Sequence, residues 1–308
     1  MGDAHYDLII IGGGPAGMTA GLYAARSRMN VLLIEKVVLG GQILITDWIE
    51  NYPGFPEGIS GCDLAMKMNE QASKFGLKTE SDQVVSLNLS SSAKEVSLLS
   101  GKTITAKSII IATGASPRKL DVTGEDRLIG KGVSFCGTCD GPFFRDKVVA
   151  AVGGGDTAVQ ESIYLTKFVK KVYLIHRRSE LRATKILQER AFSNKKIEFV
   201  WDSCVKSVNG EMGVESVTIK NLKKGSCSDL AVDGCFVWIG TLPNNAFIGN
   251  SLKLDDYGFI ITNERMETSA PGVYAVGDVR NTPVRQIASA VGDAAIAAYL
   301  AEQYIEDL

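Results

Sequence analysis

The chain has 308 residues, of which 45% are hydrophobic and 22% charged, a composition typical of an ordinary globular protein of about two domains. Its formal net charge of -2 gives no general attraction to nucleic acid or to an anionic membrane, so we expect neither as a partner. The N-terminal segment lacks the basic region and the uninterrupted apolar run of a signal peptide, and no segment approaches the ~20 apolar residues that span a bilayer. We therefore expect a cytoplasmic protein.

The order strand, glycine-rich turn, helix, strand occurs twice along the chain. The first copy has an apolar run at 6–11, a turn at 12–17, a helix to about residue 27 and an apolar run at 31–34. The second copy has the same segments in the same order, at 148–152, 153–158, up to about 167, and 172–175. The apolar runs are unbroken, as expected for parallel strands covered on both faces. The sequence predicts an α/β fold with two doubly wound, Rossmann-like dinucleotide-binding domains.

The first glycine-rich turn has the features of a dinucleotide site. Its three glycines permit the tight turn, the close approach of a pyrophosphate and close helix packing. Glu35 closes the next strand, where a carboxylate accepts hydrogen bonds from an unphosphorylated ribose and repels a phosphate. We therefore predict FAD or NAD at this turn, and not NADP. The motif residues are Gly12, Gly14, Pro15, Ala16, Gly17 and Glu35.

The second turn predicts a different nucleotide. Ala158 takes the place of the third glycine, and arginines take the place of the acid after the second strand. Three guanidinium groups suit a 2'-phosphate dianion, because arginine forms bidentate, charge-assisted bonds to phosphate. We therefore predict NADPH here. The residues assigned to this site are Gly153, Gly155, Asp156, Thr157, His176, Arg177, Arg178 and Arg182.

Two extended connections mark the domain boundaries. At 109–117 and at 236–243 an apolar strand ends in glycine and reaches proline three residues later, and proline disfavours a helix before it. We therefore predict a discontinuous first domain, 1–117 and 244–308, with a second domain, 118–243, inserted into it. Alternating apolar residues between 86 and 107 predict a small antiparallel β insertion in the first domain.

Further flavin contacts are expected near the end of the chain. Asp278 follows an apolar strand, where a carboxylate can bind the hydroxyls of a ribityl chain. Arg285 and Gln286 open a last helix, expected from about 285 to 304, whose positive end can stabilise the negative charge of a reduced flavin.

Only one pair among the six cysteines is close in sequence, Cys136 and Cys139, followed by Asp140. A vicinal dithiol at a turn or helix start can form a compact disulfide, and Asp140 can supply or accept a proton as it opens. A zinc site needs two more ligands, and neither a second Cys-x-x-Cys nor a well-placed histidine provides them, so we predict no metal. The other four cysteines are expected to be inert and to pack as small hydrophobic residues: Cys62, Cys204, Cys227 and Cys235.

Along nearly its whole length the chain resembles the low-molecular-weight thioredoxin reductases. The resemblance rests on the two glycine-rich turns, the dithiol with its aspartate, and four further motifs: Gly40-Gly41-Gln42, His176-Arg177-Arg178 with Arg182, Gly277-Asp278 and Arg285-Gln286. It implies that the flavin is FAD, that Cys139 faces it, that Cys136 attacks the disulfide of a thioredoxin-like partner, and that Asp140 is the acid. It also implies a homodimer. The FAD site would include Gly41, Gln42, Asn51, Asp278, Arg285 and Gln286, and we assign Thr113, Gly114 and Gly277 to it as well.

The chain departs from the family at Gly137, where alanine is commoner; glycine loosens the turn but keeps the cysteine spacing. The leading interpretation is NADPH-dependent reduction of the thioredoxin disulfide through FAD and the Cys136–Cys139 disulfide. Two other functions remain open. The same electron path could serve a glutaredoxin-like redoxin or the disulfide carrier of a peroxidase. Alternatively, the chain could be a non-catalytic flavoprotein that senses NADPH.

Overall fold

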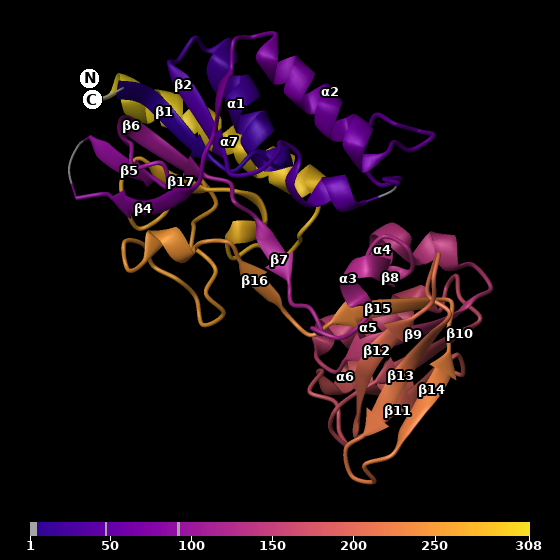
Figure 1. Ribbon diagram of the computed structural model, residues 1–308. Helices are drawn as coiled ribbons and strands as arrows, with labels where there is room; N and C mark the ends of the chain where they lie inside the picture. Colours follow the sequence, from indigo (N-terminus) through magenta and orange to yellow (C-terminus); the bar gives the residue numbers. More distant parts are fainter. Residues whose placement is uncertain (1–4, 47, 91–92) are drawn as a thin grey trace. The chain divides into compact units, whose positions relative to one another are not determined.

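The computed structural model describes residues 5–46, 48–90 and 93–308. Part of the N-terminal segment that bears on the signal-peptide prediction, residues 1–4, lies outside the described residues. The chain folds into two compact units, which Figure 1 shows coloured along the sequence. Unit 1 comprises Met1–Ser116 and Leu242–Leu308, and unit 2 comprises Pro117–Thr241. None of the helices in the described part of the chain combines the length and apolar character needed to cross a bilayer.

Unit 1 is built on a mixed sheet with a parallel centre. The strand order is β3-β2-β1-β6-β5-β4, and β17 pairs with β6. Strands β1, β2, β3, β6 and β17 run parallel, whereas β5 and β4 extend the sheet in antiparallel pairing. The strands are β1 His5–Ile11, β2 Val31–Glu35, β3 Lys78–Ser81, β4 Val84–Asn88, β5 Lys94–Leu98, β6 Thr103–Ile111 and β17 Val273–Ala275.

Strand β1 is apolar at successive positions because both of its faces are covered. Leu8 and Ile10 pack into one core with the alanine-rich helices α1 and α7, while Ile9 and Ile11 pack into a second core on the opposite face. Small side chains on α1 and α7 allow the two helices to approach closely. The helical segments of unit 1 are α1 Pro15–Arg26, η1 Gly41–Ile45, α2 Gly61–Ser73, η3 Ala246–Ile248, η4 Gly277–Val279 and α7 Ile287–Glu306.

Unit 2 contains a parallel sheet and a smaller antiparallel one. The parallel sheet has the order β11-β10-β9-β15-β8, and the antiparallel sheet the order β12-β13-β14. Along β9, Val149 and Ala151 enter one core and Ala150 and Val152 the other. The strands are β8 Val133–Ser134, β9 Val148–Gly153, β10 Lys171–Ile175, β11 Ile197–Val200, β12 Ser203–Asn209, β13 Ser216–Asn221, β14 Cys227–Ala231 and β15 Gly234–Trp238. The helices are α3 Glu125–Leu128, α4 Gly137–Asp140, η2 Gly141–Phe144, α5 Asp156–Leu165 and α6 Lys185–Ser193.

The chain passes between the units twice, and the two passing segments pair with each other. Strands β7 Ala115–Pro117 and β16 Thr241–Pro243 form a two-stranded ribbon. Gly114 and Gly240 flank this ribbon with φ angles of 66° and 127°, which glycine adopts without the steric cost of a side chain.

The predicted α/β fold with two doubly wound sheets is confirmed, and three details differ. The antiparallel strands after residue 84 are not a separate insertion, because β6 continues from them directly into the parallel centre of the main sheet. The β12-β13-β14 sheet was not predicted. The helices α1, α5 and α7 end or begin one or two residues from their expected ends.

Candidate active site

The glycine-rich turn of unit 1 follows β1 and leads into α1. Gly12 has a φ of 105°, and a Cβ atom there would lie 2.5 Å from the carbonyl oxygen of Ala112. A Cβ atom on Gly17 would overlap the carbonyl oxygen of Gly12. Gly14 is different, because the only atom near its Cβ position is the Gly40 carbonyl oxygen, at 4.0 Å. The backbone of Gly14 therefore borders open space, as close approach of a pyrophosphate requires.

Three other loops meet this turn at the carboxyl ends of the parallel strands. A Cβ atom on Gly41 would lie 3.2 Å from the Cα of Gly14, and one on Gly277 would lie 3.4 Å from the Cβ of Ala16. The loop after β6, with Thr113 and Gly114, follows Ala112 and so lies beside Gly12. Unit 1 thus brings the 12–17, 41–42, 113–114 and 277–278 segments to the edge of the sheet where α/β folds bind nucleotides.

The side chain of Glu35, at the end of β2, binds backbone N–H groups of the turn and of the segment after β2. Its Oε2 accepts the N–H of Gly13 at 2.7 Å, and its Oε1 accepts the N–H of Val37 at 3.1 Å. An ionised carboxylate has about four lone-pair positions. Glu35 can therefore orient the turn and still accept hydrogen bonds from ribose hydroxyls.

Buried polar atoms in unit 1 indicate that its site is shaped for a polar ligand. Thr113 Oγ1 and Arg285 Nε are buried without a hydrogen-bond partner among the described residues. Buried polar groups are nearly always paired, so a ligand that supplies the missing partner fits here. Asn51 Nδ2 donates to Gln286 Oε1 at 3.0 Å, which joins two predicted FAD residues from distant parts of the chain.

Asp278 lies in the same site, and burial raises the pKa of its carboxyl to about 6. The positive charge of Arg285 lowers this pKa, whereas the negative charge of Asp293 raises it further. A half-buried carboxylate of this kind is well suited to accept hydroxyl hydrogen bonds from a ligand. The residues of unit 1 thus fit FAD: open backbone at Gly14, spare acceptor positions on Glu35 and a carboxylate at Asp278.

The second glycine-rich turn has the same architecture in unit 2. A Cβ atom on Gly155 would meet nothing within 4 Å, so this backbone also borders open space. Asp156 and Gly154 hold the loop after β10, residues 176–184, against the turn, and we call this segment the arginine loop. Asp156 Oδ1 accepts the N–H of Thr184 at 2.6 Å, and the Gly154 carbonyl accepts the N–H of Arg182 at 2.7 Å. This structural role of Asp156 differs from the predicted one, and it brings the arginine loop to the glycine-rich turn.

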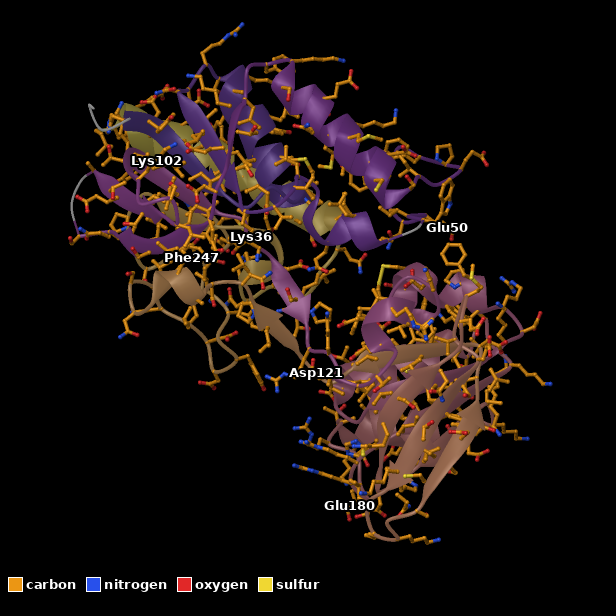
Figure 2. The ribbon with its side chains drawn as sticks, in the orientation of Figure 1. Lys36, Glu50, Lys102, Asp121, Glu180 and Phe247 are labelled. Carbon is orange, nitrogen blue, oxygen red and sulfur yellow. A yellow bond between two sulfur atoms is a disulfide. The ribbon has the colours of Figure 1, made fainter. Side chains whose placement is uncertain are left out.

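The arginine loop borders a depression of about 430 Å³, lined by Arg178, Ser179, Glu180, Leu181, Arg182 and Asp202. Figure 2 labels Glu180 on this part of unit 2. Arg177, Arg178 and Arg182 are exposed and form no ion pair with any described residue, which leaves their charges available to a phosphate.

His176 is buried, and its Nε2 has no hydrogen-bond partner among the described residues. Burial and, to a smaller extent, the charges of Arg182 and Arg178 lower the pKa of this imidazole. The lowered pKa favours the neutral imidazole, which adds shape rather than charge to the site. The open backbone at Gly155 and the free arginines fit NADPH.

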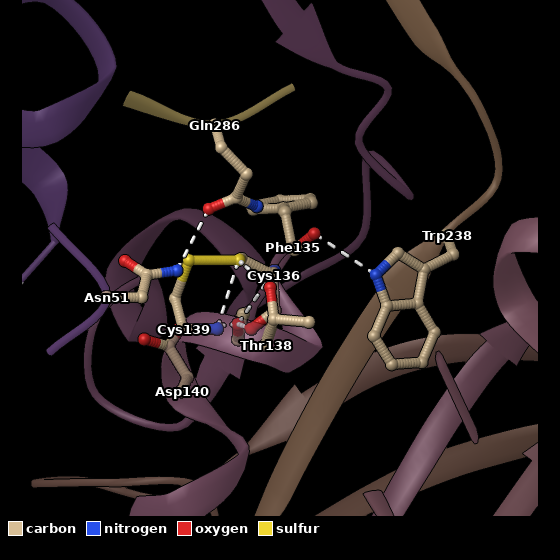
Figure 3. Close-up of a disulfide and its surroundings, with 9 residues drawn as sticks. Asn51, Phe135, Cys136, Thr138, Cys139, Asp140, Trp238 and Gln286 are labelled. Atoms are coloured by element: carbon tan, nitrogen blue, oxygen red, sulfur yellow. Dashed lines mark hydrogen bonds between the residues drawn. A yellow bond between two sulfur atoms is a disulfide. The ribbon is translucent and has the colours of Figure 1, made fainter. Parts of the chain in front are cut away.

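The dithiol lies at the start of α4 in unit 2 and forms a disulfide between Cys136 and Cys139, with their Cα atoms 5.3 Å apart (Figure 3). Cys136 precedes the helix, and its Sγ accepts the N–H of Cys139 at 3.2 Å. Thr138 Oγ1 lies 3.4 Å from the same sulfur. A thiolate formed at Cys136 would keep these two hydrogen bonds and be stabilised by them.

Two residues that the sequence reasoning missed support this disulfide. Ser134 is buried, and its hydroxyl donates to Asp140 Oδ2 at 2.5 Å while accepting the N–H of Cys136 at 3.1 Å. Trp238 Nε1 donates to the carbonyl oxygen of Phe135 at 3.1 Å, which fixes the backbone before Cys136. Ser134 thus links the proposed acid to the cysteine backbone. No sequence signal distinguishes this serine from any other.

The prediction that the other cysteines pack as small hydrophobic residues is wrong for two of them. Cys235 is fully buried, and burial raises the pKa of its thiol to about 12, so it is inert. Cys204 is half-buried, whereas Cys62 and Cys227 are exposed. Among the described residues no cluster of three or more histidine, cysteine, aspartate or glutamate side chains is placed to hold a metal ion.

Paired Rossmann-like folds, one of which carries a disulfide, are the arrangement of an oxidoreductase that works with dinucleotides. A family profile described as pyridine nucleotide-disulphide oxidoreductase matches residues 6–294. The thioredoxin reductase of Peptoclostridium acidaminophilum is 45% identical over 98% of this chain and 97% of its own. That of Bacillus subtilis strain 168 is 44% identical over 98% and 96%.

Solved structures give the same result. The thioredoxin reductase of Streptococcus pyogenes MGAS5005 is 48% identical, covers 100% of both chains and superposes with a TM-score of 0.94. That of Lactococcus lactis, in its FR conformation, is 44% identical and covers 98% of this chain and 100% of its own, with a TM-score of 0.69. The chain belongs to the pyridine nucleotide-disulphide oxidoreductase family and, within it, to the thioredoxin reductases.

Proposed function

We propose that this chain reduces the disulfide of thioredoxin with electrons from NADPH, through bound FAD and the Cys136–Cys139 disulfide. The observation that carries the proposal is the disulfide in unit 2 beside a glycine-rich turn with open backbone and free arginines. Unit 1 would be the FAD domain and unit 2 the NADPH domain. Their bounds lie within two residues of the boundaries expected from the glycine and proline pattern.

The residues of unit 1 bind and orient the flavin. The turn from Gly12 to Gly17 would hold the pyrophosphate, Glu35 the adenosine ribose, and Asp278 the ribityl chain. Arg285 and Gln286, at the start of α7, would place positive charge and hydrogen-bond donors near the ring. When bound, FAD accepts two electrons from NADPH and delivers them to the disulfide.

The residues of unit 2 select and hold NADPH. The backbone around Gly155 would contact the pyrophosphate, and Arg177, Arg178 and Arg182 would surround the 2'-phosphate. Thr157, in the first turn of α5, is exposed beside this backbone and could donate to a phosphate oxygen. A ribose without the 2'-phosphate leaves the three arginines unmatched, so we expect NADPH to be preferred.

Reduction of the disulfide breaks the Sγ–Sγ bond and produces a thiolate at Cys136 and a thiol or thiolate at Cys139. The Cys136 thiolate then attacks one sulfur of the partner's disulfide, which forms a mixed disulfide and releases the partner's other sulfur as a thiolate. Asp140, held by the Ser134 hydroxyl, donates a proton to a departing thiolate. Cys139 attacks Cys136 to release the dithiol product and restore the starting disulfide.

The decisive experiment measures oxidation of NADPH at 340 nm by the purified flavoprotein in the presence of thioredoxins from its own host. We expect turnover that requires both thioredoxin and NADPH. Efficient turnover with a glutaredoxin-like redoxin or a peroxidase-linked carrier, but not with thioredoxin, would move the proposal to that acceptor. Absence of turnover with every disulfide acceptor would favour the non-catalytic sensor.

We also propose that the enzyme is a cytoplasmic homodimer, as the family resemblance implies. Four unpaired cysteines, two of them exposed, are compatible with a reducing compartment. Sedimentation equilibrium of the FAD-loaded protein tests the assembly, and a monomer at micromolar concentration would contradict it.

A further inference from the structure

A carboxylate that the mechanism above does not use binds the turn that carries the dithiol. Glu161 projects from α5, and its side chain accepts hydrogen bonds from the backbone N–H groups of Gly137 and Thr138. These residues stand between the two cysteines. The next N–H along the chain, that of Cys139, donates to Cys136 Sγ at 3.2 Å.

Three successive N–H groups of one turn are therefore divided between two acceptors. Glu161 takes the first two, and the sulfur of Cys136 takes the third. When Glu161 is ionised and Cys136 is a thiolate, both acceptors are negatively charged. Because like charges held by the same turn repel each other, each disfavours ionisation of the other.

The absence of a side chain at residue 137 is what admits this carboxylate. A Cβ atom on Gly137 would overlap Oε2 of Glu161 and would lie 3.1 Å from Cζ2 of Trp238. Trp238 is fixed by its own hydrogen bond to Phe135, so the flexible carboxylate is the group that would have to move. Gly137, where alanine is commoner in the family, thus leaves the space that the Glu161 carboxylate occupies.

We propose that Glu161 is a positioning residue that keeps the Cys136–Cys139 pair strongly reducing, by binding the backbone of residues 137 and 138 and placing a negative charge beside the Cys136 thiolate. In the two-electron reduction of this disulfide, a destabilised thiolate makes the reduced form less stable relative to the disulfide. The electrons are then passed on more readily to the partner's disulfide.

The surroundings of Glu161 act on its charge in two opposite ways. Burial raises the pKa of its carboxyl, and the two backbone N–H groups oppose that rise. Among the described residues no lysine or arginine forms an ion pair with it. When Glu161 is ionised, its charge is therefore stabilised by the turn that carries the dithiol and not by an ion pair with a cation.

The test uses Glu161→Gln, which removes the charge and retains an amide oxygen that can still accept a hydrogen bond. The purified flavoprotein is equilibrated with mixtures of reduced and oxidised dithiothreitol, trapped with a maleimide, and the state of the pair is read by mass spectrometry. We expect the equilibrium constant for reduction of the pair to rise about three- to tenfold. The rate of Cys136 alkylation at pH 7 should rise in the same direction, because more of the reduced pair is thiolate.

The matched control is Glu189→Gln, a charge removal on the exposed surface of α6 in the same unit. It should leave both readouts unchanged. A melting temperature that falls in Glu161→Gln without any change in the equilibrium would make Glu161 a purely structural residue and overturn the proposal. An equal shift in Glu189→Gln would overturn it too, because the effect would then be that of net charge.

Gly137→Ala provides a second, independent test in case Glu161→Gln folds poorly. The added methyl should displace the carboxylate and shift the equilibrium in the same direction. Combined with Glu161→Gln it should add little, because the charge is already gone. Fully additive shifts would contradict the coupling. The inference rests on the proposed function only for the role of the dithiol. Because the dithiothreitol equilibrium needs neither NADPH nor thioredoxin, failure of the inference about Glu161 is distinguishable from failure of the proposed function.

Discussion

We predict that the arginine loop determines which nicotinamide nucleotide the enzyme accepts. Replacing Arg177 and Arg178 by glutamine removes two charge-assisted contacts to the 2'-phosphate, each of which contributes about 1.5 to 3 kcal/mol. We expect KM for NADPH to rise roughly a hundredfold or more while KM for NADH changes little. Arg190→Gln, on the exposed face of α6, is the control and should behave as wild type. Equal use of NADH by the unmodified enzyme would contradict the assignment.

The two cysteines act after the flavin has been reduced. In Cys136→Ser or Cys139→Ser, NADPH should still bleach the flavin absorbance, because this step precedes any thiol chemistry, whereas reduction of thioredoxin should stop. Stopped-flow absorbance separates the two steps. If either variant bound NADPH normally and kept its fold but failed to bleach, the dithiol would lie before the flavin on the electron path.

We predict that Asp278 lowers the stability of the unliganded protein at neutral and alkaline pH while it contributes to FAD binding. Its raised pKa of about 6 lies above that of an unfolded aspartate, so the associated stability is fully present below pH ~4 and is lost as the pH rises through ~6. We expect Asp278→Asn to stabilise the apoprotein at pH 8 by roughly 2 kcal/mol, with a difference that shrinks toward pH 4. Thermal melts at both pH values measure this.

The same variant should bind FAD about tenfold more weakly, because a charged acceptor for hydroxyl groups is lost. Asp256→Asn, at an exposed position, is the control and should alter neither quantity. Unchanged FAD affinity in Asp278→Asn would remove Asp278 from the flavin site.

At the scale of single residues, the sequence reveals the side chains that belong to local motifs and misses those that arrive from elsewhere in the fold. Cys136, Cys139 and the arginines stand in recognisable spacings. Glu161 is 25 residues from Cys136 in the numbering and reaches Gly137 only because α4 packs against α5. No spacing rule on a linear sequence predicts such a contact.

The two glycine-rich turns have the same architecture, and an added methyl group in one turn should affect the binding of only one nucleotide. Gly155 has open space at its Cβ position and an ordinary φ of -90°, so Gly155→Ala should cost little stability. The methyl would nevertheless occupy the space of the pyrophosphate. We expect weaker NADPH binding with FAD retained, and the reverse for Gly14→Ala, whose φ is -74°. Titrations of each variant with both nucleotides check this cross pattern, and a variant that loses both nucleotides would contradict it.

At the scale of elements, regular local signals were sufficient for the parallel cores. The runs at 6–11 and 148–152 are apolar at successive positions, and each is followed by glycines that only a tight turn explains. The β12-β13-β14 sheet gave no comparable signal, since its short strands mix apolar residues with lysine, serine and asparagine. For β4 and β5 the alternation predicted strands correctly, but alternation cannot tell which sheet a strand joins.

At the scale of the whole molecule, the distribution of the proposed sites between the two units constrains the order of the reaction steps. The residues proposed for FAD belong to unit 1, whereas the residues proposed for NADPH and the dithiol both belong to unit 2. Each must bring its reacting atoms to roughly 3 to 3.5 Å from one flavin ring. Two reactants carried by the same unit compete for that one place, and a disulfide that faces the flavin is hidden from a protein partner.

We therefore predict that unit 2 rotates against unit 1 during every turnover. The chain passes between the units only through β7 and β16, and each passage is flanked by a glycine with positive φ, Gly114 and Gly240, as short hinges permit. For the test, the exposed Cys62 and Cys227 are first replaced by serine, and one cysteine is introduced into each unit. A bismaleimide then crosslinks the two introduced cysteines in the oxidised enzyme. The crosslinked enzyme should complete one half-reaction, flavin reduction or thioredoxin reduction, and fail in the other, while the same variant blocked with N-ethylmaleimide turns over normally. Full steady-state activity with the crosslink confirmed by mass spectrometry would show that no rotation is needed.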